Sequence, residues 1–253
     1  MLKAPRSPVC RNRWARVVID DCADGRTNPR GRRIVTTLPT MRIKTRWFKS
    51  GETKSETEQA GAMGFIVWRV AQQMLKRMRG AQFDIDAGPQ YFAFMREVLV
   101  FLVAVTDRIA HSRLSAEGRG EFTVALVRHL ARTLQESEDE WLGAAAAGAP
   151  SHSDTFIDLV NEVTQHYAEF GAEPGVPDAG AGFHPDFGFV RYLGKRLEPT
   201  LPEKDRRWVI EQVMAADAPE ALGIVQSSMR NLYDPVPARP RRSPRSRRRA
   251  ASS

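Results

Sequence analysis

Apolar residues recur at intervals of three or four positions from Ser55 onward, the spacing of one buried face of an α-helix. Ser55 is followed three residues later by Glu58, a pairing typical of a capping box at a helix start. Gly80 is a typical helix terminator after the basic residues that precede it. The pattern predicts a first helix between Ser55 and Gly80, with a buried face made of Phe65, Ile66, Val70, Met74, Leu75 and Met78.

A second helix is predicted to begin at Pro89, because proline suits a first helical position, and Asp86 is the expected cap. The main apolar stripe of this helix is centred on Val98 and includes Tyr91, Phe94, Leu102, Val105 and Ile109. Further apolar residues lie outside the stripe: Phe92, Leu99, Val100, Phe101 and Val103. A helix packed on two sides would not bury all of them, so we expect a contact with another chain.

Two more long helices follow at the same spacing. The third begins near Ser115 and carries Phe122, Leu126, Leu130 and Leu134. Its last turn is acidic, which opposes the helix dipole, so we expect that end to fray. The fourth follows Ser151 or Ser153 and ends by Gly171, with a buried face made of Phe156, Val160, Val163 and Tyr167.

Shorter helices are predicted from Asp186 to Leu197, from Pro202, and from Asp217 to Leu232, after a Gly/Pro-rich loop at 171–185. No stretch alternates as a half-buried strand does. The sequence therefore predicts an all-α protein. We expect an antiparallel bundle of about four long helices with about three shorter flanking helices, because short linkers place successive helices side by side. The bundle is expected to span residues 52–233, between disordered ends at 1–51 and 234–253.

The charge distribution separates these ends from the bundle. The 253 residues carry a net charge of +8. Residues 1–40 hold nine basic and three acidic side chains, and residues 235–253 hold seven arginines and no acid. Residues 41–234 hold 22 basic and 27 acidic side chains, which leaves a net charge of −5. The positive charge therefore belongs to the ends of the chain.

The first forty residues have two alternative explanations. Met41 stands where the composition becomes helical, so residues 1–40 are either a mis-assigned upstream start or a targeting segment. Three aspartates, Asp20, Asp21 and Asp24, argue against a transit peptide. Cys10 and Cys22 both lie in this segment, so the bundle has no thiol; we expect a reduced, cytoplasmic location and no transmembrane segment.

Carboxylates and imidazoles at helical spacing are the candidates for metal chemistry. Asp107 and His111 are four residues apart in the second helix, and Asp158, Glu162 and His166 follow at four-residue steps in the fourth. Di-metal bundles use a Glu-x-x-His spacing on inward faces, whereas these residues lie opposite the apolar stripes. A solvent-exposed polar face is therefore the favoured interpretation, and we expect no metal and no cofactor. No nucleophile motif or phosphate-binding loop is present, so the chain is interpreted as non-enzymatic.

Two basic segments are candidates for nucleic-acid binding. Arg42, Lys44, Arg46 and Trp47 interleave cations with an aromatic ring, which suits phosphate contacts and base stacking. The same segment would equally suit an anionic membrane surface or an arm packed on its own bundle. The C-terminal candidates are Arg241, Arg242, Arg245, Arg247, Arg248 and Arg249. Such a tail would bind a polyanion weakly and in a salt-sensitive manner.

These observations lead to one hypothesis and two alternatives. The leading hypothesis is a helical protein-interaction or assembly module, with an unknown protein partner or a second copy of the chain. The first alternative is nucleic-acid binding through the basic ends. The second, disfavoured by the metal-ligand spacing, is a metal-dependent bundle enzyme.

Overall fold

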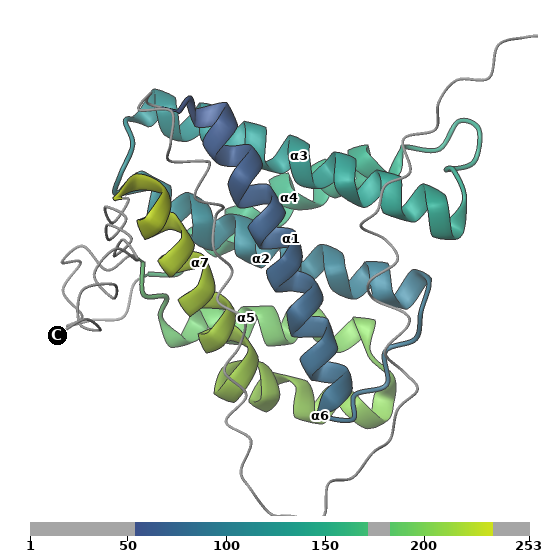
Figure 1. Cartoon of the computed structure of the whole chain (residues 1–253). Helices are drawn as coiled ribbons and strands as arrows, with labels where there is room; N and C mark the ends of the chain where they lie inside the picture. The colour runs from purple at the N-terminus through teal and green to yellow at the C-terminus, as the bar shows by residue number, and fades with distance from the viewer. Residues whose placement is uncertain (1–53, 172–182, 235–253) are drawn as a thin grey trace, which may run out of the picture. The chain divides into compact units, whose positions relative to one another are not determined.

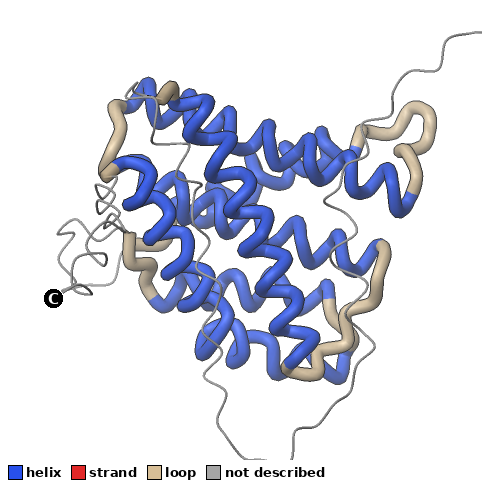
Figure 2. The backbone as a smooth tube through the Cα atoms, viewed as in Figure 1, coloured by secondary structure: helices blue, strands red, loops and turns tan. Residues whose placement is uncertain are grey.

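The computed structural model of the chain describes residues 54–171 and 183–234. Within these ranges the secondary structure is helical, which confirms the predicted all-α fold (Figure 1). The elements are α1 (Glu56–Gly80), α2 (Pro89–His111), α3 (Ala116–Leu142), α4 (His152–Ala168), α5 (Phe187–Leu197), the 3-10 turn η2 (Glu198–Thr200), α6 (Glu203–Gln212), the π-helical turn η3 (Val213–Asp217) and α7 (Ala218–Tyr233). Loops and turns join the helices (Figure 2).

Capping residues set the start of four helices. The side chains of Ser55, Ser115, Ser151 and Asp186 each accept a hydrogen bond from the backbone N–H three residues ahead. Each bond satisfies one of the N–H groups that the first helical turn leaves without a partner. Ser55 and Glu58 form the complete capping box that the sequence predicts.

The predicted cap of α2 is wrong. The residue before α2 is Gly88, with φ of 105°, and no side chain caps this helix start. The backbone N–H of Asp86 instead donates to Oε1 of Gln90 at 2.8 Å. Pro89 has no N–H to satisfy, so one capping group fewer is needed.

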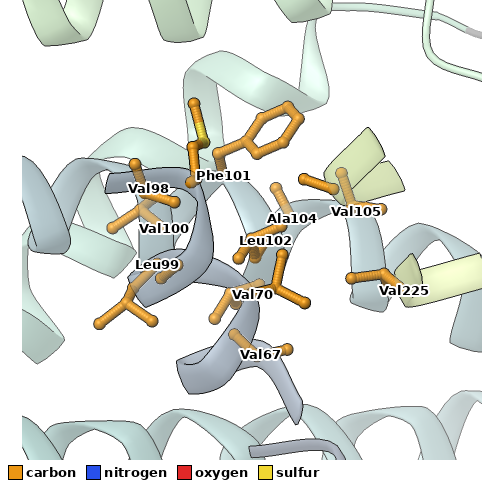
Figure 3. Packing of buried hydrophobic residues seen from close by; sticks show 14 of the residues in the cluster. Val67, Val70, Val98, Leu99, Val100, Phe101, Leu102, Ala104, Val105 and Val225 are labelled. Carbon is orange, nitrogen blue, oxygen red and sulfur yellow. The ribbon is translucent and has the colours of Figure 1, made fainter. Parts of the chain in front are cut away.

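Helix α2 lies at the centre of the fold. It contacts α1, α3, α4, α5 and α7 (Figure 1). Every residue from Val98 to Thr106 is buried, on all sides of the helix. Figure 3 shows Leu102 close to Val70 of α1 and Val105 close to Val225 of α7.

This central position explains why α2 carries more apolar residues than one buried face requires. The residues outside the main stripe, Phe92, Leu99, Val100, Phe101 and Val103, are each at most 2% exposed. They are covered by helices of the same chain, so the expected contact of these residues with another chain is wrong. The prediction failed because α2 has neighbours on every side, which its own periodicity does not reveal. On α1, Phe65 was predicted to be buried, but it is 47% exposed.

Helices α1 and α3 approach closely at Gly64. A Cβ atom added to Gly64 would lie 2.3 Å from Cδ2 of His129 in α3. The absence of a side chain at Gly64 therefore makes room for the imidazole. Burial is the largest cause that lowers the pKa of His129.

Helix α7 begins at Ala218, next to the predicted start at Asp217, but α6, η3 and α7 follow one another without a gap. Pro219 has no N–H, and in a regular helix its ring would clash with the carbonyl four residues earlier. The wider π turn lies directly before this proline, so the helical chain can continue from α6 into α7. Asp217 in that turn is buried, and it accepts hydrogen bonds from Nε of Arg77 at 3.0 Å and Nε2 of Gln212 at 3.0 Å.

Candidate binding cleft

A cleft of about 780 Å³ lies between α2, α3 and α4. Its residues are Val103, Ala104, Asp107, Arg108 and His111 of α2, Arg119, Thr123, Val124, Val127 and Arg128 of α3, and Ile157, Val160, Asn161, Thr164, Gln165, Tyr167 and Ala168 of α4. We call it the α2–α3–α4 cleft. Its volume lies within the range of roughly 300–1,000 Å³ that is typical of small-molecule sites.

Helices α3 and α4 run antiparallel along the cleft. Near the loop that joins them, the backbone N–H of Ser153 donates to Oε1 of Gln135 at 3.0 Å. At the other end, Asp107 of α2 contacts Arg119 near the start of α3, and Arg108 of α2 contacts the last turn of α4. The second half of α2 therefore packs against both α3 and α4.

Apolar side chains supply much of the lining. Val103 and Ala104 come from α2, Val127 from α3, and Ile157 and Val160 from α4. Val124, also on α3, is 49% exposed. The apolar surface on both helices suits the nonpolar part of a ligand.

Asp107 forms an ion pair inside the cleft. Its Oδ1 accepts hydrogen bonds from Nε of Arg119 at 2.9 Å and from Oγ1 of Thr123 at 2.8 Å, and its Oδ2 pairs with Nη2 of Arg119. The hydrogen bond to Asp107 is the largest cause that raises the pKa of Arg119. The Asp107 side chain is only 21% exposed, so its predicted place on an open, solvent-exposed face is wrong. The reason is that α3 folds over this face of α2.

Arg108 binds the end of α4. Its Nη2 donates to the carbonyl oxygens of Tyr167, Ala168 and Phe170 at 3.3, 3.2 and 2.9 Å. The guanidinium also lies over the ring of Phe183, at 5.6 Å from its centroid. Since the last carbonyls of a helix lack intrahelical partners, these bonds give Arg108 a structural role.

The five metal-ligand candidates are not brought together. Asp107 and His111 line the cleft, whereas Asp158, Glu162 and His166 are exposed on α4 and do not line it. The imidazole of His166 lies beside the ring of Tyr192 in α5, with centroids 6.0 Å apart. In the part of the chain that the structure describes, no group of three or more His, Cys, Asp or Glu residues is arranged to hold a metal ion.

At the loop end of the α3–α4 pair, the buried Glu138 is contacted by the partly exposed Arg96 and His152, and we call these three residues the Glu138 cluster. Oε2 of Glu138 accepts a hydrogen bond from Nη2 of Arg96 at 2.8 Å and lies 3.0 Å from Nδ1 of His152. Oε1 of Glu138 and Nε of Arg96 are buried and have no hydrogen-bond partner among the residues that the structure describes. Burial is the largest cause that raises the pKa of Glu138, opposed by Arg96.

This cluster corrects the expected fraying of α3. The helix continues through its acidic turn to Leu142. Arg96 and His152 supply partners for Glu138, which offsets the unfavourable interaction of an acid with the helix C-terminus.

Several residues of the cleft and the cluster were not identified from the sequence, notably Arg119, Arg128 and Glu138. Asp107 and Arg119 are 12 residues apart in different helices, so no spacing within one helix connects them. The available signals were the apolar residues Val124, Val127 and Ile157, which lie beside the main stripes of their helices. Such residues indicate a second covered or concave face.

The candidate nucleic-acid contacts lie outside the described residues. This applies to Arg42, Lys44, Arg46 and Trp47, and to the C-terminal Arg241, Arg242, Arg245, Arg247, Arg248 and Arg249. Within residues 54–171 and 183–234, no helix has both the length and the hydropathy needed to span a membrane. Comparisons of the chain with protein-family models, curated proteins and solved structures found no match.

Proposed function

We propose that the helical domain is a binding module and that the α2–α3–α4 cleft takes a small amphipathic molecule. The single observation that carries this proposal is the cleft itself, about 780 Å³ with apolar residues on all three helices. The proposed binding surface is therefore this cleft and not the apolar surface of α2, which other helices of the same chain cover. Its polar groups offer ways to orient a ligand.

A binding role agrees better with these side chains than a catalytic one. Asp107 is held by Arg119 and Thr123, and Arg108 by the end of α4. A general base must be able to reach a substrate proton, and a carboxylate already engaged by two donors is poorly suited to that. Binding requires only complementary shape and charge.

A pair of matched variants tests the proposal. Thr164 lines the cleft and Thr155 lies exposed elsewhere on α4, and each hydroxyl donates to the carbonyl four residues earlier, at 2.6 and 2.9 Å. Thr164→Trp places a large ring in the cleft, whereas Thr155→Trp places the same ring outside it. Decanoate below its micelle concentration and 1-decanol below its solubility limit serve as probes in ¹H–¹⁵N correlation spectra, which also show whether each variant is folded.

We expect at least one probe to shift the amide signals of Val103, Val127 and Val160. Folded Thr164→Trp should lose these shifts, because the added ring occupies the cleft, and Thr155→Trp should keep them. The proposal is wrong if neither probe binds at these residues, or if folded Thr164→Trp binds as well as the parent protein.

A further inference from the structure

We infer that the ligand of the cleft is an amphipathic monoanion, an alkyl or aryl body ending in a carboxylate, whose head group binds Arg128. This inference rests on the proposed binding function and adds the chemical class of the ligand.

The cleft is positively charged within an acidic stretch of chain. Three arginines line it, Arg108, Arg119 and Arg128, against the single acid Asp107. Residues 41–234 as a whole carry an excess of acids, 27 against 22 basic side chains. The excess of positive charge at the cleft therefore favours an anionic ligand over a cationic one.

Of the three arginines in the cleft, two are engaged by other groups of the described part of the chain and one is not. Arg108 binds the last carbonyls of α4, and Arg119 pairs with Asp107. Arg128 is exposed, and within the described residues it has no hydrogen-bond or ion-pair partner. Its planar guanidinium is thus available to bind a carboxylate through two parallel hydrogen bonds.

The helix register places a second polar group near Arg128. Gln135 and Ser153 are hydrogen-bonded across the antiparallel pair. Moving seven residues back along α3 reaches Arg128, and moving eight residues forward along α4 reaches Asn161. These steps correspond to about 10 and 12 Å along the two helix axes, so Arg128 and Asn161 lie at about the same level of the cleft. The Asn161 amide can donate a hydrogen bond to the same head group.

The apolar body has a place to lie next to this head-group site. Val127 precedes Arg128 on α3, and Ile157 is one helical turn from Asn161 on α4. The arginine-rich C-terminal residues 235–253 carry no acid, so their charge does not match that of the cleft. A small anion fits both the charge and the size.

Matched head groups and matched arginines test the inference. Decanoate, 1-decanol and decyltrimethylammonium have the same alkyl chain with negative, neutral and positive head groups. Isothermal titration calorimetry measures their affinities for the whole chain, for Arg128→Gln and for Arg132→Gln. Arg132 is exposed one turn further along α3 and does not line the cleft, so it controls for the loss of a surface charge.

We expect decanoate to bind at least about tenfold more tightly than decanol, since only the charged head group forms charge-assisted hydrogen bonds with the guanidinium. Arg128→Gln should weaken decanoate binding by about tenfold and leave decanol unchanged, and Arg132→Gln should do neither. Equal binding of decanoate and decanol, tighter binding of the ammonium probe, or an unchanged Arg128→Gln would overturn the inference while leaving the proposed binding function standing. Binding of none of the probes would overturn both.

Discussion

The two ends of the α3–α4 pair use the same chemistry in different surroundings. At the loop end, Arg96 pairs with Glu138, whose side chain is 0% exposed. At the other end, Arg119 pairs with Asp107, and their side chains are 35% and 21% exposed. Both pairs connect α2 to α3, but only the second lies in a cleft. An arginine–carboxylate contact by itself therefore does not identify a functional site.

The difference between the two ends lies in the free energy of desolvation. A buried carboxylate loses its hydration, and its partner must compensate for that loss. A partly exposed pair keeps much of its hydration, so its net contribution is small. The loop end is thus expected to tolerate little change, whereas the cleft end can be altered with little loss of stability.

The largest expected change in the free energy of unfolding comes from truncating an apolar side chain at each end. Phe156 is 0% exposed on α4 near the loop end, whereas Val124 at the cleft is 49% exposed. Phe156→Ala should lower the free energy of unfolding by about 3–5 kcal/mol, because it leaves a cavity. Val124→Ala should lower it by less than about 0.5 kcal/mol. Urea denaturation measures both, and similar losses would contradict the contrast.

Replacing the arginine of each ion pair is expected to have the next largest effect on stability. Arg96→Met should destabilise the protein by about 3 kcal/mol at pH 8, because Glu138 is left buried and charged without this partner. Arg119→Met should cost less than about 1 kcal/mol, since Asp107 keeps its bond to Thr123 and some solvent. Denaturant midpoints at one pH compare them directly, and an Arg119→Met loss as large as that of Arg96→Met would break the comparison.

The sequence predicted those features of the α3–α4 pair that depend on residues close together in the chain. Ser115 could be identified as a helix start, and the start of α4 could be narrowed to Ser151 or Ser153, because a cap bonds to a residue three positions away. Neither the cleft nor the Glu138 cluster could be identified in this way. Asp107 and Arg119, or Arg96 and Glu138, meet only because of the angles at which α2 and α3 pack, and a helical wheel shows a face without showing what covers it.

The smallest expected effect is a pH dependence that belongs to the loop end. Burial raises the pKa of Glu138 in the folded protein above its value in the unfolded chain. The folded state therefore retains this proton at a higher pH, and the contribution of Glu138 to stability falls as pH rises between the two pKa values. Arg96 of α2, His152 of α4 and the neighbouring Asp139 are the charged groups that face it.

Glu138→Gln removes this titrating carboxyl, and glutamine keeps an acceptor for Arg96. Each pKa unit of difference between the folded and unfolded states corresponds to about 1.4 kcal/mol. Relative to Glu138→Gln, the parent protein should therefore gain stability as pH falls from 7 toward 5. Glu140→Gln, which removes an exposed carboxylate from the same turn of α3, is the matched control. Thermal unfolding at a series of pH values measures the differences. If the parent protein instead loses stability relative to Glu138→Gln on acidification, the Arg96 and His152 contacts outweigh desolvation, and the expected difference between the loop end and the cleft end is wrong.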